Sequence, residues 1–106
     1  MSHPIPAHHY DENLEMALEN LPDLIADSLE KWRTATLDRE KTEALLHARF
    51  KGEDPDRKAN DIKCLINTSD ERYQACLKEI KAEAEYQRRY EKLMGIKRLV
   101  SLRTAI

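Results

Sequence analysis

The residues of this chain that could do chemistry are arginines and lysines gathered near its C-terminus. Between positions 88 and 103, six basic side chains stand against one acid, Glu91, which gives this stretch a charge of +5. The six are Arg88, Arg89, Lys92, Lys97, Arg98 and Arg103. Cations neutralise phosphates and aromatic rings stack on bases, so the stretch predicts contact with single-stranded nucleic acid, with Tyr86 and Tyr90 one helical turn apart as stacking groups. Tyrosines at this spacing are also typical of core or interface positions, which is the simpler interpretation of both.

Negative charge gathers in the opposite half of the chain, over residues 11–30. This stretch holds seven acids and no Lys or Arg, a charge of −7. The acids are Asp11, Glu12, Glu15, Glu19, Asp23, Asp27 and Glu30. Two uses of this segregation compete. Either the acidic helix of one subunit lies against the basic helix of another and charge fixes their orientation, or the basic stretch stays exposed and follows a phosphate backbone.

No set of side chains indicates an active site, a metal site or a cofactor site. His47 is the only histidine outside the first ten residues, and there is no Gly-rich phosphate loop. Paired carboxylates such as Asp70 and Glu71 fall at expected helix starts or on charged faces, where the helix dipole or solvent accounts for them. The three histidines of the first ten residues are not regularly spaced, so they indicate a lead-in segment and not a metal site. We therefore expect a protein that is not an enzyme and uses no metal and no cofactor.

Long helices are needed to carry these charged segments. Ala, Leu, Glu, Lys and Arg dominate the chain after Asp11, and only two glycines occur. Apolar residues from Leu14 to Trp32 recur at steps of three and four, which predicts one helical face that begins at an N-cap on Asp11. Because Pro22 removes a backbone donor inside this pattern, we expect a short helix over about 11–20, a break or kink, and a long helix with Pro22 in its first turn.

The long helix should end near Phe50, with Gly52 taking the left-handed conformation of a C′ residue. The segment from Glu53 to Asp56, Glu-Asp-Pro-Asp, is the clearest turn signal of the chain. We expect the hairpin turn over Gly52 to Asp56, an antiparallel return, and Asp56 as the cap of the returning helix.

The returning helix should be interrupted once and then run to near the end of the chain. The cluster Asn67-Thr68-Ser69-Asp70 favours side-chain hydrogen bonds to its own backbone, which predicts a break with a new N-cap at Thr68 or Ser69. The apolar stripe that follows indicates a helix of about 33 residues, about 50 Å long. It runs through Tyr73, Leu77, Ile80, Ala84, Tyr90, Leu93, Met94, Ile96 and Val100. Because the stripe runs beyond what the first helix should cover, its far part is expected to pack against another subunit.

The predicted fold is therefore all-α: a long antiparallel helical hairpin of coiled-coil type that is oligomeric. We expect a flexible arm over residues 1–10 and a single hairpin domain over residues 11–106. The sequence has no apolar run of the ~18 residues that a membrane span needs, and its first residues lack the pattern of a signal peptide. Cys64 and Cys76 are too far apart for a paired-cysteine motif and are expected to be reduced thiols. These features predict a cytoplasmic protein without a membrane partner.

The order of these elements resembles that of the UvsY-type recombination mediators of bacteriophages. The resemblance covers roughly residues 25–103 and rests on the helix end over 43–54 and the closing segment over 93–103. The segment Ala-Glu-Ala-Glu-Tyr-Gln-Arg-Arg-Tyr over 82–90 resembles small coiled-coil proteins found among phage recombination genes. The resemblance to the mediators implies a non-enzymatic accessory protein that oligomerises, binds single-stranded DNA and helps a recombinase displace single-strand-binding protein. The expected DNA contacts are the six basic residues of the C-terminal stretch, with Lys41, Arg49 and Lys51 as further contributors from the hairpin end.

A helical protein–protein interaction module with no nucleic-acid role fits the same sequence. A scaffold, an adaptor or a secretion-related hairpin would use the same stripes and charges. A hairpin of this length with a central Trp is similar to WXG-type secreted proteins, but Trp32-Arg33-Thr34 lacks the glycine and lies within a helix instead of at the turn. The sequence leaves the DNA-binding and the interaction-module interpretations open.

Overall fold

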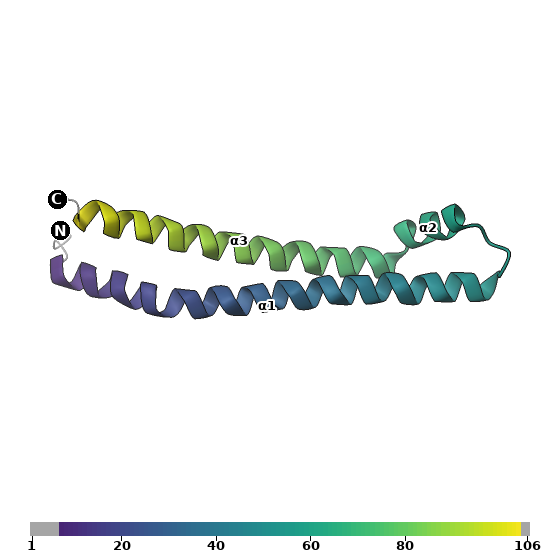
Figure 1. Cartoon of the computed structure of the whole chain (residues 1–106), viewed down its shortest axis with the longest axis horizontal. Helices are drawn as coiled ribbons and strands as arrows, with labels where there is room; N and C mark the ends of the chain where they lie inside the picture. The colour runs from purple at the N-terminus through teal and green to yellow at the C-terminus, as the bar shows by residue number, and fades with distance from the viewer. Residues whose placement is uncertain (1–6, 105–106) are drawn as a thin grey trace, which may run out of the picture.

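The computed structural model describes the backbone of residues 7–104 and the side chains of residues 16–102. Within this part the chain forms three helices: α1 over Ala7–Glu53, α2 over Ala59–Thr68 and α3 over Asp70–Thr104. α2 and α3 return beside α1, so the start of α1 and the end of α3 lie together at what we call the open end of a hairpin (Figure 1). The predicted all-helical fold is confirmed for the described residues.

The hairpin is long and thin. Its principal extents are 72 × 29 × 18 Å and its radius of gyration is 22.5 Å, whereas a globular domain of about 100 residues has a radius of gyration of about 13 Å. The length follows from α1, whose 47 residues span about 70 Å at 1.5 Å per residue. None of the described helices, although long, carries an apolar stretch sufficient to cross a lipid bilayer.

The helix break predicted at Pro22 is wrong. α1 runs through this position without interruption, with Pro22 inside the helix and exposed (Figure 1). Proline removes one backbone donor and crowds the preceding turn, but Leu21 is buried and Ile25 half-buried on the inner face, so packing on both sides holds this turn helical. α1 also begins at Ala7, before the expected N-cap Asp11. Residues 1–6 of the predicted arm lie outside the described residues.

Continuity of α1 changes what covers the far part of α3. Because α1 is unbroken, it extends beside α3 to the open end, where Leu21 of α1 and Leu93 of α3 are both buried. α1 of the same chain therefore covers Leu93 and part of Ile96 and Val100, whereas Tyr90 of the stripe stays exposed. Packing of this part of α3 against another subunit stays a prediction.

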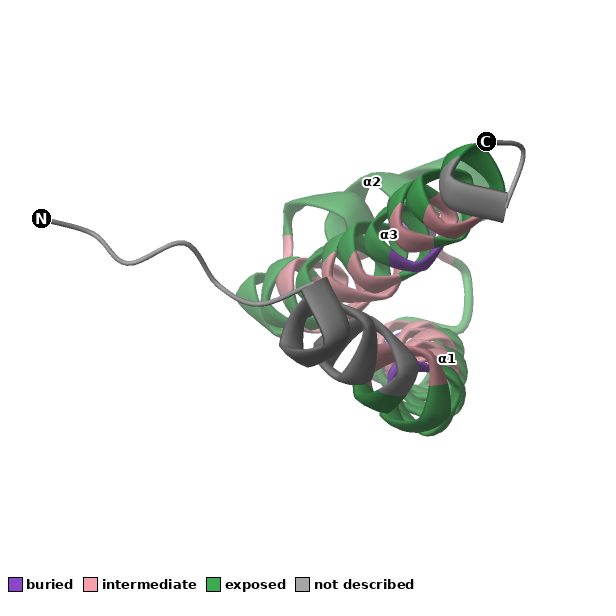
Figure 2. Cartoon of the chain, turned by 90° about the vertical axis from the view of Figure 1, so that its left-hand side faces the viewer, coloured by how far each residue is buried: buried purple, intermediate pink, exposed green. Residues whose placement is uncertain are grey.

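The two long helices meet along positions that recur at steps of three and four, which we call the seam. In α1 the seam consists of Leu18, Leu21, Ile25, Ser28, Trp32, Ala35, Arg39, Thr42 and Leu46, all buried or half-buried. In α3 it consists of Arg72, Ala75, Glu79, Ala82, Tyr86, Arg89, Leu93, Ile96 and Val100. Figure 2 shows the half-buried residues of the two helices turned toward each other and the exposed residues turned outward. The spacing is that of a left-handed coiled coil.

Several large apolar residues lie outside the hairpin, including Tyr73 and Ile80 of the predicted stripe. Leu37 and Leu45 of α1 are 64% and 62% exposed, and Tyr73 and Ile80 of α3 are 58% and 59% exposed. The physical reason is that long polar side chains, such as Arg39, occupy seam positions with their aliphatic parts covered. The predicted stripe and the seam coincide toward the open end, at Leu21, Ile25 and Trp32 of α1 and at Leu93 and Ile96 of α3, and they diverge toward the turn.

The hairpin turn forms where predicted but without the expected glycine conformation. α1 ends at Glu53 and α2 begins at Ala59. Gly52 is the penultimate residue of α1, and no glycine in the described part of the chain has a positive φ. Arg57 instead closes the end of α1, because its guanidinium donates to the Phe50 carbonyl oxygen (2.9 Å).

A second side chain organises the turn. The Asp54 carboxylate accepts a hydrogen bond from the Asp56 N–H (3.1 Å), an interaction by which Asp residues stabilise turns. The N-cap of α2 is Lys58, which makes no side-chain capping bond, so the capping role predicted for Asp56 is wrong. The second break is confirmed: α2 ends at Thr68, and the Ser69 hydroxyl accepts the Arg72 N–H (3.3 Å) as the N-cap of α3.

Candidate interaction surfaces

The most buried polar contact joins Ser28 of α1 to Arg89 of α3. Ser28 is 1% exposed, and its hydroxyl donates to the Leu24 carbonyl oxygen (2.8 Å) and accepts from Arg89 Nη1 (2.6 Å). The same Nη1 donates to the Leu24 carbonyl oxygen (2.9 Å), and Nη2 lies 2.8 Å from the Glu85 carboxylate. Arg89 was expected to bind nucleic acid from outside the apolar stripe. It lies in the seam instead and joins the two helices.

A network of four charged side chains crosses the seam nearer the turn. Arg39 of α1 bonds Glu79 of α3 (2.7 Å) and Glu43 on its own helix (2.9 Å), and Arg72 of α3 bonds the same Glu43 oxygen (3.2 Å). The hydrogen bonds to Glu79 and then Glu43 raise the pKa of Arg39 above its ordinary value. Burial pushes the pKa of the Glu43 carboxyl upward, but Arg39 and Arg72 outweigh burial and hold this pKa below its ordinary value. The network therefore favours the fully ionised state.

Aromatic side chains fill the seam between these polar layers. The half-buried ring of Trp32 lies 5.4 Å from that of Tyr86, centroid to centroid, and Tyr86 lies 6.1 Å from Tyr90. Both separations fall in the range of favourable aromatic pairs. Tyr86 is thus a packing residue, and Tyr90, which is exposed, is the one of the two predicted stacking tyrosines that has a free outer surface.

The remaining residues of the basic stretch lie on the outside of α3. Arg88, Lys92, Lys97 and Arg98 are all exposed. None of them belongs to an ion pair found among the described residues. Arg103 lies in α3, and its side chain is outside the described residues.

The three basic residues proposed from the hairpin end are not brought together with this stretch. Arg49 pairs with Glu71 (2.9 Å), which places it near the turn, whereas Arg89 contacts Ser28 toward the open end. Lys51 donates to the Arg57 carbonyl oxygen (3.0 Å) and so belongs to the turn. Lys41 lines a groove described below. The nine candidate cations therefore do not form one surface.

The acidic and basic stretches lie side by side in one chain. The contacts of Arg89 with Leu24 and Ser28 set residues 24–28 of α1 beside residues 85–89 of α3, and both stretches occupy the open end (Figure 1). The juxtaposition that the sequence assigned to two subunits is therefore already present within one subunit. Exposed acids such as Asp23, Asp27 and Glu30 nevertheless belong to no ion pair in the described part of the chain.

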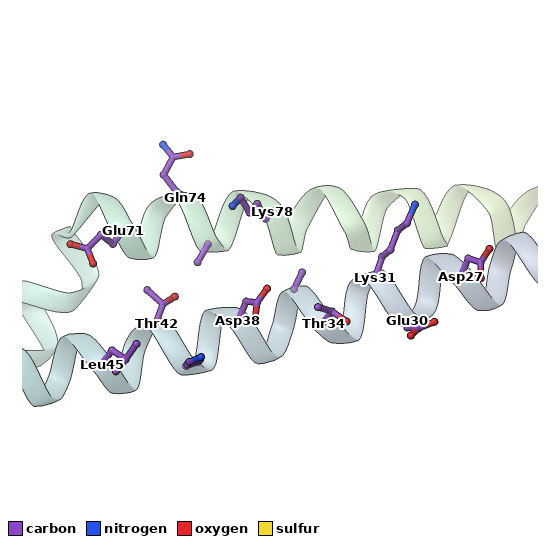
Figure 3. Close-up of a pocket in the computed structure, with 13 residues that line it drawn as sticks. Asp27, Glu30, Lys31, Thr34, Asp38, Thr42, Leu45, Glu71, Gln74 and Lys78 are labelled. Atoms are coloured by element: carbon purple, nitrogen blue, oxygen red, sulfur yellow. The ribbon is translucent and has the colours of Figure 1, made fainter.

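A groove runs between α1 and α3 along one side of the hairpin, which we call the groove side. Its floor holds small seam residues, Ala35, Thr42 and Ala75, because these leave space that larger side chains would fill. Figure 3 shows Asp27 at one end, Leu45 and Glu71 at the other, and Lys31 extending from α1 toward α3. The other lining residues are Glu30, Thr34, Asp38, Lys41, Gln74 and Lys78. The lining is mostly charged, and no group of three metal-ligating side chains occurs among the described residues.

The sequence prediction missed the polar seam residues, although a signal for them was present. Ser28 and Thr42 follow Leu21 at multiples of seven residues, and Arg39 follows Trp32 at the same step. A pattern defined by apolar residues alone leaves these three polar positions out. Charged residues with opposite signs at matching steps in both helices would have indicated the cross-hairpin pairs.

Comparison with known proteins adds no assignment to these surfaces. No protein-family model, curated protein or solved structure matches the chain. The geometry of the groove side, the outer face of α3 and the open end is therefore the basis for a functional proposal.

Proposed function

We propose that this protein is a non-catalytic helical interaction module that assembles with a second copy of itself. One observation carries the proposal: the hairpin leaves more large apolar side chains exposed than it buries. Among the described residues the buried ones are Leu21, Leu46, Ile62 and Leu93. The exposed ones are Met16, Leu24, Leu37, Leu45, Leu65, Tyr73, Ile80, Tyr90, Leu99 and Leu102.

Apolar surface of this extent favours association. Covering a large apolar side chain contributes about 1.5–3 kcal/mol when burial is complete, and contiguous exposed apolar surface on soluble proteins usually marks an interaction site. Two helices alone enclose too little volume to bury these apolar side chains. A second copy of the chain is therefore the simplest surface that could bury them. Two hairpins that pack against each other would form a thicker helical bundle.

The experiment that tests this proposal is light scattering on the full chain after size-exclusion chromatography. At tens of micromolar, the module should have at least twice the 12.4 kDa mass of one chain, and dilution should lower the mass by mass action. A mass of one chain at every concentration would remove self-assembly as the function.

A second candidate function is binding of single-stranded DNA as a recombination accessory protein. Its support is the exposure of Arg88, Lys92, Lys97 and Arg98 without ion-pair partners, together with the resemblance to UvsY-type mediators. A recombinase and a single-strand-binding protein would then be its further partners. The exposed acids of α1 beside this stretch weaken the attraction of a polyanion, which is why we rank this function second.

Fluorescence anisotropy with a labelled single-stranded oligonucleotide tests the second candidate. If it is correct, affinity should fall by about tenfold or more between low and physiological salt, because bound phosphates release counterions. Reversing Arg88, Lys92 and Arg98 to Glu should then abolish binding while circular dichroism stays unchanged. No binding by the natural protein at low salt would leave the interaction module alone.

We also propose that the protein works in the cytoplasm. The support is that Cys64 and Cys76 are free thiols, one exposed and one half-buried, as is usual for proteins of a reducing compartment.

A further inference from the structure

The groove side presents two rims of different charge. From α1 the rim carries the acids Asp27, Glu30 and Asp38 and the bases Lys31 and Lys41. From α3 the groove is lined by Lys78 and by Glu71, which is already paired with Arg49. Lys81, Arg88 and Lys92 follow Lys78 at steps of three, seven and four residues, which places them on the same face of the helix. Glu85 lies on this face too but is paired with Arg89. The unpaired charges of the α3 rim are therefore all basic, whereas the α1 rim carries three acids and two bases.

These rim charges are not used within the chain. The ion pairs between described residues involve the seam, the turn and the Arg89–Glu85 pair. Seven rim residues have no oppositely charged group of a described residue within the 4.0 Å that defines those pairs, and all seven are exposed. They are Asp27, Glu30, Asp38, Lys78, Lys81, Arg88 and Lys92. The groove keeps the two rims apart, so that each remains available to a partner.

Apolar residues mark both ends of the same side. Leu24, Lys31, Asp38 and Leu45 follow one another at steps of seven along α1, so they form one line beside the seam. Three of them line the groove, and the two leucines are 43% and 62% exposed. A partner on this side would cover Leu24 and Leu45 as well as meet the rim charges.

We propose that a second copy of the chain docks on the groove side, related to the first by a two-fold axis parallel to the length of the hairpin. Such an axis sets the α1 rim of each copy against the α3 rim of the other and leaves positions along the hairpin unshifted. This rests on the self-assembly proposed above and adds the surface and the orientation. The product is a four-helix bundle.

The register within one chain fixes which charges would meet. Ser28 contacts Arg89, and Arg39 contacts Glu79. Asp27 and Glu30 therefore lie at the level of Arg88 and Lys92. In the same way, Asp38 lies at the level of Lys78 and Lys81. At these two levels the three acids of the α1 rim, with Lys31 and Lys41 beside them, meet the unpaired bases of the α3 rim. The other two-fold arrangement, with α1 against α1 and α3 against α3, would set the unpaired bases of the two α3 rims against each other.

The two signs of charge on one side also select the class of partner. A phosphate backbone would be attracted to the α3 rim but repelled by three exposed acids across the groove. A surface with the same two signs in the opposite order satisfies both rims, and a second copy turned by the two-fold axis presents that surface.

Two charge-reversed variants test this arrangement. The first carries Asp27→Lys, Glu30→Lys and Asp38→Lys; the second carries Lys81→Glu, Arg88→Glu and Lys92→Glu. Each alone should repel its own copy, with the dissociation constant of the dimer raised by about tenfold or more. Mixed in equal amounts they should form a heterodimer, because each basic rim then meets an acidic one. Formation of the heterodimer also proves that both variants are folded.

A control variant carries Arg33→Glu, Lys63→Glu and Lys97→Glu. It changes the net charge by the same amount as the second variant, but at exposed positions that do not line the groove. It should keep the natural mass in light scattering. Variants that keep the natural mass alone, or a mixture that stays monomeric, would overturn the proposed surface while leaving self-assembly intact. A monomeric natural protein would instead remove the proposed function itself. If the second variant keeps its mass but loses binding to a labelled single-stranded oligonucleotide, the basic rim serves nucleic acid and the proposal is overturned.

Discussion

Ser28 and Arg89 show how single polar residues fix the register of this hairpin. An apolar seam of similar side chains tolerates sliding, whereas a buried hydroxyl and a guanidinium with specified partners do not. The Leu24 carbonyl, the Ser28 hydroxyl and the Glu85 carboxylate all converge on the Arg89 guanidinium. Displacing α3 by one turn would take the Arg89 guanidinium away from the Leu24 carbonyl and the Ser28 hydroxyl of α1.

Replacement of Arg89 by Ala should therefore lower the free energy of unfolding by about 1–2 kcal/mol, the usual size for a lost partly buried hydrogen-bond group. Arg33→Ala is the matched control, because Arg33 is exposed, does not line the groove and belongs to no ion pair among the described residues, and it should change stability by less than about 0.5 kcal/mol. Urea unfolding followed by circular dichroism measures both. Equal effects of the two substitutions would contradict the structural role of Arg89.

Glu43 should make stability depend on pH at the acidic end. Its folded pKa is below the ordinary value, so the ionised carboxylate stabilises the fold fully above the unfolded pKa of about 4.3. That contribution is lost as pH falls through the lower folded pKa. The stability difference between the natural protein and Glu43→Gln should thus shrink as urea unfolding is repeated from pH 7 toward pH 3. A difference that stays constant over this range would rule out the ionic contribution.

At the scale of the helices, α1 decides the architecture. Its passage through Pro22 lets it cover α3 to the open end, and this sets the acidic and basic stretches side by side. Had the helix broken there, as local chemistry predicts, the two stretches would have needed separate subunits to meet.

Substitution of Pro22 by Ala distinguishes these two possibilities. In a continuous helix, alanine restores a backbone donor and removes a steric conflict, so stability should rise by about 1–3 kcal/mol. If Pro22 instead occupied the first turn of a separate helix, where proline is favoured, alanine would be neutral or destabilising. Thermal unfolding by circular dichroism gives the sign directly.

Local signals in the sequence predicted the helices and their boundaries better than the faces the helices bury. The turn after Glu53 and the cap at Ser69 depend on residues close in sequence, and both were found. The continuity of α1 and the exposure of Leu45 depend on contacts with α3 across the hairpin. Because Arg39 and Glu79 pair at seam positions, hydrophobicity alone pointed to the wrong residues in the half of the hairpin near the turn. For the same reason, the basic residues predicted to bind nucleic acid lie on different surfaces of the hairpin.

At the scale of the whole molecule, a hairpin 72 Å long and 18 Å thin is nearly all surface. Its stability and its function therefore both depend on which of its faces are buried against another surface. The groove side offers separated charges and two exposed leucines, and a second copy turned about the long axis would cover both.

The most direct measurement is zero-length carboxyl–amine crosslinking of an equal mixture of natural-abundance and ¹⁵N-labelled protein. Mass spectrometry then shows whether a peptide pair linking Asp27 to Lys92, or Asp38 to Lys81, comes from one chain or from two. We predict pairs with one light and one heavy member as abundant as the two uniform kinds together, which is the statistical result for links between subunits. Pairs that are only uniformly light or uniformly heavy would show that the rims meet within single chains, and would contradict the dimer.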